Sequence, residues 1–124
     1  MINAFLEITH FNQTTVKYAV ERLIVLLSDS ERTDISVRIE DAYKEICNAL
    51  HKAEHSQSNH DFRLNMLSAC KQSKGLVNLI RFIRIYKVII VLDEDYQAFE
   101  ELVDSIEKAR RHIHKTDYTF KSLD

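Results

Sequence analysis

The sequence contains no proline and no tryptophan, and its 124 residues include a single glycine, Gly75. Tight turns between β-strands usually depend on glycine or proline, so this composition disfavours a sheet protein. Acidic and basic residues nearly balance, and the formal net charge of -2 excludes a nucleic-acid-binding protein that is basic overall. We therefore expect a single all-α domain, because a chain of this length has room for one hydrophobic core.

Cysteine is also scarce, and long apolar runs are missing. Cys47 and Cys70 both fall on apolar faces of expected helices, where free thiols behave as small hydrophobic side chains, so we expect no disulfide between them. No apolar run reaches the roughly 20 residues of a membrane-spanning helix. The first residues, MINAFLEITH, lack the pattern of a signal peptide. The expected location is cytoplasmic, away from membranes.

Two amphipathic helices are expected in the first half of the chain, because apolar residues there recur at spacings of three and four. The first is expected to begin near residues 13–15, with Asn12 or Thr14 as its N-cap, and to end in the polar segment 28–34. The second is expected to follow a cap at Asp34 or a neighbour. The predicted buried faces are Val16, Ala19, Val20, Leu23, Ile24 and Leu27 in the first helix, and Val37, Ile39, Ala42, Tyr43, Ile46, Leu50 and Ala53 in the second.

The segment 61–90 predicts a long third helix, with Ser58 or Asn59 as its N-cap and more apolar surface than one neighbouring helix can cover. Its main apolar stripe comprises Leu67, Cys70, Leu76, Leu79, Ile80, Phe82, Ile83, Tyr86 and Ile89. Gly75 lies inside this helix, where glycine costs about 1 kcal/mol relative to alanine. Close contact with another helix, or a kink, is therefore expected at Gly75.

Three apolar residues of the third helix, Val77, Ile85 and Val88, fall outside the main stripe. A monomer would leave them in water, so we expect the chain to form a homo-oligomer. Residues 88–92, VIIVL, have the composition of a strand, but a lone strand in a helical chain would have no hydrogen-bonding partner. We interpret them as the end of the third helix and a short connection.

A fourth helix is expected after Asp93, its predicted N-cap, with Glu94 and Asp95 in the first turn, where negative charge is favourable. Its predicted buried stripe is Tyr96, Phe99, Leu102, Val103, Ile106, Ala109 and Ile113. Residues 1–12 are expected to be an N-terminal arm and residues 116–124 a loose C-terminal tail. Short loops between four helices predict an antiparallel up-down-up-down four-helix bundle.

Positive charge is concentrated on one edge of the third helix, which contains no acidic residue between positions 62 and 92. With the third and fourth helices antiparallel about a turn near Val91, Arg81 and Arg84 are expected to face the acidic residues within 100–104. Surface ion pairs of this kind contribute less than about 1 kcal/mol each. We therefore expect both arginines to affect the fold or the assembly more than the binding of a partner.

The same register places Lys71 and Lys74 opposite the basic residues within 110–114. Like charges brought together need an anion, so phosphate or RNA binding is a candidate function of this end of the bundle, against the alternative of a solvated basic surface. The candidate nucleic-acid-binding residues are Lys71, Lys74, Arg110, Arg111, His114, Arg81 and Arg84.

Catalytic and metal-binding motifs are weak. His51, Glu54 and His55 match the H-x-x-E-H spacing of certain zinc enzymes, and His60 is a further potential ligand. The match lies at a helix end beside a polar loop, and it arises easily in a chain with six histidines and nineteen acidic residues.

The arginine and histidine spacing of helical ribonucleases of the HEPN type is also absent, since the arginines and histidines within 110–114 are too close together. We expect no enzyme, metal or cofactor.

Residues 59–114 resemble a four-helix-bundle family. The resemblance is carried by LIRFIR at 79–84, Tyr96 and IEKAR at 106–110. The family includes the accessory variability determinant proteins of diversity-generating retroelements and the proteins encoded in intervening sequences of bacterial large-subunit ribosomal RNA genes. The resemblance implies a non-enzymatic bundle that forms a homopentameric ring and assists a reverse transcriptase and its template RNA.

Two classes of function follow from the sequence. The preferred one is an accessory subunit that binds a reverse transcriptase, its template RNA, or both. The alternative is a protein–protein interaction or regulatory bundle, for example of the antitoxin type, with no role in nucleic-acid binding. The charge blocks support the first class, and the surplus of apolar surface is compatible with both.

Overall fold

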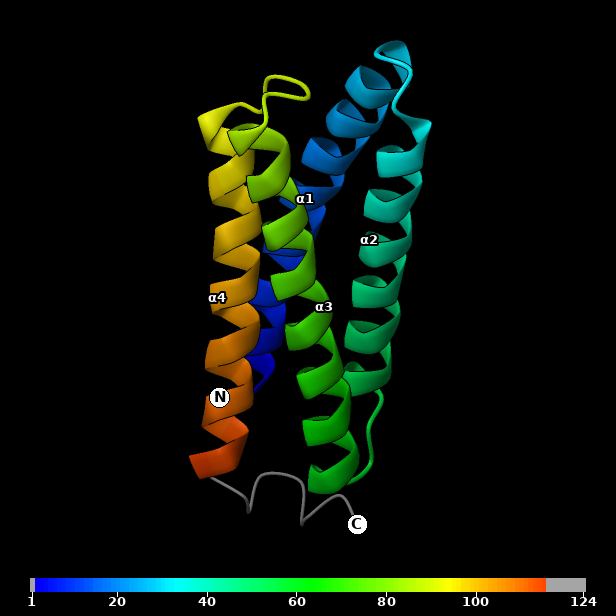
Figure 1. The fold of residues 1–124 in the computed structure, drawn as a ribbon. Helices are drawn as coiled ribbons and strands as arrows, with labels where there is room; N and C mark the ends of the chain where they lie inside the picture. The colour runs from blue at the N-terminus through cyan, green and yellow to red at the C-terminus, as the bar shows by residue number, and fades with distance from the viewer. Residues whose placement is uncertain (1, 116–124) are drawn as a thin grey trace.

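The computed structural model describes residues 2–115, with side chains from Glu7 to Arg111, and this part of the chain holds four helices and no strand. The helices are α1 (Ile2–Asp29), α2 (Thr33–Glu54), α3 (Asn59–Ile85) and α4 (Asp93–Lys115). Each helix packs antiparallel against the next one, and α4 also packs against α1, which closes the bundle (Figure 1). The predicted all-α up-down-up-down bundle is confirmed.

The core runs along the axis of the bundle, because each helix turns one apolar stripe inward. The largest fully buried side chains are Phe62, Phe99, Leu23, Leu27, Ile39, Ile46, Leu50, Met66, Leu76, Ile80, Ile83 and Leu102. Burial of one such side chain is worth about 1.5–3 kcal/mol relative to its exposure to water. None of the helices in the described part of the chain is long and apolar enough to cross a bilayer.

Helix α1 is longer than predicted. It begins at Ile2, so the predicted N-cap at Asn12 or Thr14 is wrong, and most of the expected N-terminal arm belongs to the helix. The Thr14 hydroxyl donates to the His10 carbonyl oxygen at 3.1 Å, as threonines inside helices do. The Asn12 side chain donates to the hydroxyl of Ser105 on α4. Residues that resemble caps in the sequence therefore form contacts within and between helices.

Helices α1 and α3 both end in a Schellman motif without glycine. Glu31 follows α1 with a φ of 60°, and Lys87 follows α3 with a φ of 53°. After α3, the Val88 N–H donates to the Ile83 carbonyl oxygen at 3.1 Å, and the equivalent bond closes α1. Helix α3 therefore ends at Ile85, earlier than predicted, because the left-handed residue turns the chain away.

The buried face of α2 differs from the prediction in two respects. Val37 is 54% exposed, whereas Ile35 and Ala49 are buried. The N-cap of α2 is Arg32, whose side chain makes no capping hydrogen bond. Asp34 lies in the first turn and accepts hydrogen bonds from the Arg32 guanidinium at 3.2 Å. Asp34 is therefore a first-turn residue and not the N-cap, and its negative charge stabilises the positive end of the helix dipole.

The start of α3 agrees with the sequence, but its buried face is rotated. Ser58 is the N-cap, and its hydroxyl accepts the Asp61 N–H at 3.1 Å. Leu67, Phe82 and Tyr86, which the prediction placed in the stripe, are exposed. The buried residues of α3 are Phe62, Met66, Ala69, Cys70, Ser73, Leu76, Val77, Ile80 and Ile83. Small residues at 69, 70 and 73 face the core, and several larger apolar ones remain outside.

Helix α4 begins at Asp93, which is its first residue and not its N-cap. Phe99, Leu102 and Ile106 are buried as predicted. The Ile113 side chain and the predicted tail at 116–124 lie outside the described parts of the chain. The apolar periodicity therefore identifies the inner face of α4 correctly as far as Ala109, which is also buried.

Gly75 provides a test of α3. A Cβ atom added at this position would meet nothing within 4 Å, so the predicted close helix contact is wrong.

Gly75→Ala should stabilise the protein by about 1 kcal/mol, because alanine loses less backbone entropy in a helix. Urea denaturation followed by circular dichroism measures this change. Gln72→Ala, on an exposed position of the same helix, is the control and should change stability less. A loss of stability in Gly75→Ala would contradict the open space at this residue.

Candidate functional site

Glu107 is a buried carboxylate at the centre of the predicted basic cluster, and only 7% of the residue is exposed. It accepts a hydrogen bond from the Cys70 thiol of α3 at 2.6 Å. The Lys74 ammonium lies 2.9 Å from its Oε1 atom. Arg110 and Arg111, from the next turn of α4, approach Oε2 at 3.2 and 3.5 Å. One carboxylate therefore contacts four side chains, and two of them, Cys70 and Lys74, join α3 to α4.

These contacts change the acidity of the site. Hydrogen bonding from Cys70, followed by that from Lys74, lowers the pKa of Glu107 from 4.5 to about 2. Burial, together with the hydrogen bond to Glu107, raises the pKa of the Cys70 thiol. A thiol with a raised pKa is a poor nucleophile because the thiolate is the reactive form. Cys70 is therefore a hydrogen-bond donor inside the bundle, in keeping with its predicted burial.

The sequence correctly places Lys74 near the arginines of α4, but the prediction omits the anion between them. Lys74, Arg110 and Arg111 are brought together by Glu107 from within the protein. Three positive charges against one carboxylate still leave two in excess. Lys71 is exposed one turn before Lys74, and it has no ion pair or hydrogen bond among the residues that the structure describes. The side chain of His114, also a candidate, lies outside the described range.

Arg81 and Arg84 make different contacts from those predicted. The Arg84 guanidinium lies 2.5 Å from the carboxylate of Asp93 and 4.5 Å from the centre of the Tyr96 ring. Arg81 donates to the Tyr96 hydroxyl at 3.1 Å and to Asn78 at 3.3 Å. The predicted ion pairs with residues 100–104 are wrong. Because α3 ends at Ile85 and α4 begins at Asp93, the connection is centred before Val91, and both arginines face earlier residues of α4 than predicted.

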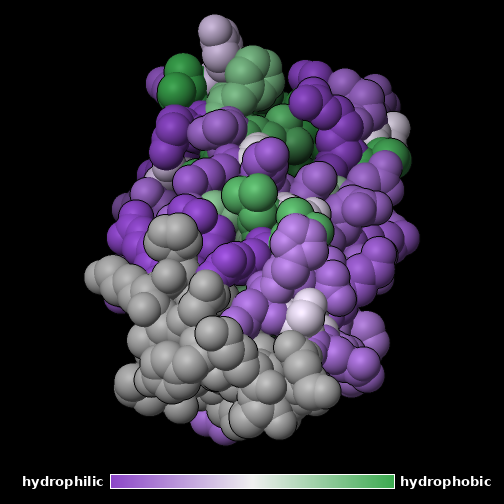
Figure 2. All heavy atoms as spheres, turned by 90° about the horizontal axis from the view of Figure 1, so that it is seen from below, coloured by the Kyte–Doolittle hydropathy of each residue, from purple (hydrophilic) through white to green (hydrophobic). Residues whose placement is uncertain are grey.

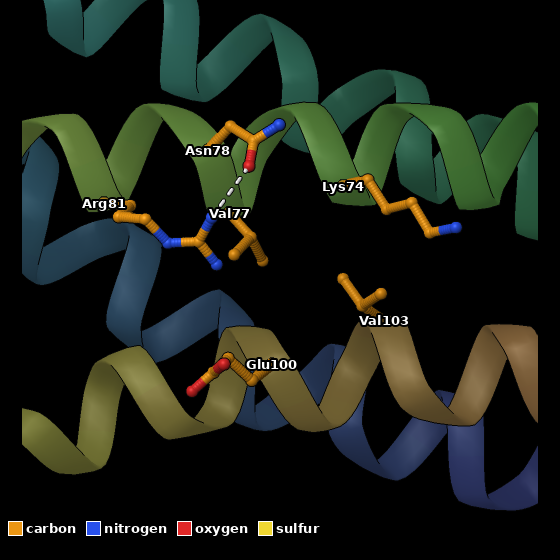
Figure 3. A pocket seen from close by; sticks show the side chains of 6 residues that line it. All are labelled: Lys74, Val77, Asn78, Arg81, Glu100 and Val103. Atoms are coloured by element: carbon orange, nitrogen blue, oxygen red, sulfur yellow. Dashed lines mark hydrogen bonds between the residues drawn. The ribbon is translucent and has the colours of Figure 1, made fainter.

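A small hollow of about 270 Å³ separates the two sets of basic residues. Figure 3 shows Lys74 and Arg81 of α3 at opposite ends of this hollow, with Glu100 and Val103 of α4 on its other side. The hydrogen bond from Arg81 to Asn78 holds the guanidinium against α3. The hollow is slightly smaller than most small-molecule sites, which occupy about 300–1,000 Å³. Its shape and charges favour a contact surface over an enclosed binding pocket.

An apolar stripe on the outer face of α1 is absent from the sequence-based prediction. We define the α1 outer stripe as Phe11, Tyr18 and Val25, which are 72%, 58% and 58% exposed. The three residues are seven positions apart, so they lie above one another on the side of α1 opposite the buried Val16 and Leu23. The seven-residue spacing is visible in the sequence, but the expected arm at 1–12 concealed it.

A second apolar surface lies where α3 ends. We define the α3 end patch as Phe82, Ile85, Tyr86 and Ile90, all of which are exposed. The rings of Phe82 and Tyr86 lie 4.6 Å apart. The opposite end of the bundle, viewed from below in Figure 2, is mostly hydrophilic wherever residues are coloured. Exposed apolar surface is therefore concentrated on α1 and at the connection between α3 and α4.

The buried carboxylate makes stability depend on pH. Because the pKa of Glu107 is lowered from 4.5 to about 2, its contribution is present above pH 4.5 and is lost as the pH falls towards 2. Glu107→Gln should lower the free energy of unfolding at pH 7 by about 1–2 kcal/mol, less than the full pKa shift implies, because the surrounding cations are partly in water. The difference from the parent protein should close as the pH falls from 4.5 towards 2.

Urea titrations at a series of pH values measure this effect. Glu45→Gln, an exposed position on α2, is the control and should follow the pH profile of the parent protein. A constant difference between Glu107→Gln and the parent protein across the same pH range would show that the loss comes from packing and not from charge.

Comparison with known proteins adds no assignment: no protein-family model matches the chain, and no curated protein or solved structure matches it significantly. A functional interpretation therefore depends on the two apolar surfaces and on the basic cluster around Glu107.

Proposed function

We propose that the protein is a non-enzymatic helical subunit that assembles with copies of itself. The observation that supports this most directly is the α1 outer stripe, three large apolar side chains on the solvent side of one helix. Scattered apolar residues are common on protein surfaces, but an aligned stripe favours a protein partner. Of the three residues that suggested an oligomer in the sequence, Val77 is buried, Val88 is half-buried and Ile85 is exposed.

The partner we propose is a second copy of this chain. Apolar residues seven positions apart form a straight line along one face of a helix, which the apolar surface of a second molecule can cover. The molecule also has a separate apolar surface, the α3 end patch, on a different element. Contact between the stripe of one copy and the patch of the next would be head-to-tail, and head-to-tail contacts close into rings when the rotation between copies permits. The homopentamer implied by the family resemblance is a ring of this kind.

Light scattering coupled to size exclusion tests the assembly. The parent protein should elute as an oligomer, with a pentamer expected. Tyr18→Lys combined with Val25→Lys should shift it to a monomer that is still helical, because charge on the stripe opposes burial. Val37→Lys is a matched control, since Val37 is similarly exposed but lies on α2, and it should leave the mass unchanged.

A parent protein that is monomeric at micromolar concentration would reject the proposal. A dimer that is absent in the α1 variant would replace the head-to-tail ring with a symmetric contact between two copies of α1. Loss of assembly in Val37→Lys would move the interface to α2.

A second candidate function is supported by the positive charge left around Glu107. An RNA-binding accessory subunit of a reverse transcriptase, which the resemblance implies, needs cations that are free to meet phosphate. Lys71 and Arg111 fit best, because Lys71 is exposed and the Arg111 side chain is 68% exposed at the edge of the Glu107 contacts. In a closed ring these residues would repeat around the assembly and their contributions would add.

RNA binding should weaken when these cations are removed. Lys71→Gln with Arg111→Gln should reduce affinity for single-stranded RNA and lower the salt slope by about 0.7 for each phosphate that is no longer neutralised. Fluorescence anisotropy across a salt series measures both quantities. Lys44→Gln is the control, because Lys44 is paired with Glu40 on α2 at 2.9 Å. Arg81→Gln and Arg84→Gln should affect the fold or assembly more than binding.

Absence of RNA binding at low salt would reject the second candidate and leave the self-assembling interaction subunit alone. Equal reductions in Lys44→Gln and in the double variant would show that binding is not localised to the basic cluster.

A further inference from the structure

The last turn of α2 gathers three metal-ligating side chains on one side. His51, Glu54 and His55 each offer a ligand atom, and these atoms all lie within 4.8 Å of one another. The His51 and His55 rings have their centres 4.4 Å apart. This closeness follows from the helix, since residues three and four positions apart lie on the same face. All three side chains are exposed, so their rotamers can adjust around an ion.

Helix α1 places a further imidazole, that of His10, beside Glu54. The His10 Nε2 atom lies 3.2 Å from the Glu54 carboxylate. This contact is possible because α1 begins at Ile2, so that His10 lies inside the helix. Neither His10 nor His60 belongs to the group of three whose ligand atoms lie within 4.8 Å of one another, but His10 contacts a member of that group, Glu54. With residues 1–12 expected to be an arm, the sequence offered no reason to consider His10.

A hydrogen bond to the backbone orients one of the ligands, His55. The Nδ1 atom of His55 lies 2.9 Å from the carbonyl oxygen of His51, so an N–H at Nδ1 donates to that oxygen. This tautomer leaves the Nε2 atom of His55 unprotonated and available as a ligand. Hydrogen bonds from a metal-binding histidine to a backbone carbonyl orient ligands in this way in natural sites.

We propose that His10, His51, Glu54 and His55 bind one divalent transition-metal ion of the zinc class. Imidazole is a borderline ligand that suits zinc, zinc also accepts a carboxylate oxygen, and four ligands complete a tetrahedral site. Glu54 acts as a ligand, in contrast to its role as a base in the zinc enzymes that share the H-x-x-E-H spacing. The bound ion connects the first turns of α1 to the end of α2 and so stabilises that end of the bundle.

Titration of the full chain with zinc chloride, after removal of any affinity tag, tests the site. Calorimetry should report one zinc ion per chain, and cobalt chloride should give the visible absorption of a tetrahedral cobalt site. His51→Gln combined with His55→Gln should abolish binding, and His10→Gln should weaken it by about tenfold or more. Zinc should raise the melting temperature of the parent protein but not that of the double variant.

Matched controls use the three remaining histidines. His60→Gln, and His112→Gln combined with His114→Gln, should leave zinc stoichiometry and affinity unchanged. The proposal is overturned if the parent protein binds no zinc at micromolar concentrations, or if binding survives in His51→Gln with His55→Gln. An unchanged affinity in His10→Gln would overturn the link between α1 and α2. Circular dichroism of each variant without metal confirms that loss of binding is not loss of folding.

Discussion

A carboxylate buried against apolar helices must be paired, and this constraint determines how α3 and α4 meet at Glu107. An unpaired charge there would cost several kcal/mol, roughly the desolvation penalty of one ion. The Cys70 thiol and the Lys74 ammonium supply partners from α3, and the guanidinium groups of Arg110 and Arg111 supply them from α4. If α3 slid along α4, the contacts of Cys70 and Lys74 with Glu107 would break at the same time. The basic cluster is therefore partly a structural requirement of the fold.

Polar contacts fix α4 against α1 in the same manner. Asp95 is buried and is held by the Arg22 guanidinium, and Ser105 receives a hydrogen bond from Asn12. The buried polar residues of α4 are thus paired with both of its neighbours. Apolar packing alone tolerates many arrangements of similar helices, whereas a polar group that must find one partner selects among them. Helix α4 therefore has the main part in fixing the register of the bundle.

The sequence predicted the four helices and their order, and it limited the cap of α3 to Ser58 or Asn59, because these features depend on apolar periodicity and local hydrogen bonds. It failed where a residue finds its partner far along the chain. Asn12 resembles a cap, yet its partner is Ser105. The prediction did not single out Glu107, although it is the counter-ion of the basic cluster. The end of α3 was missed because Lys87 adopts a left-handed conformation that usually favours glycine, and the only glycine stands elsewhere.

The early start of α1 accounts for much of what the sequence left out. Helical turns outside a core gain little from burial and are marginal in water, so they need specific contacts to persist. The contacts of Asn12 with α4 and of His10 with α2 supply them. Once those turns are helical, Phe11 comes into line with Tyr18 and Val25, and His10 comes beside Glu54. A chain whose first helix began at residue 13 would have neither the complete outer stripe nor the fourth ligand, so both surfaces depend on this extension.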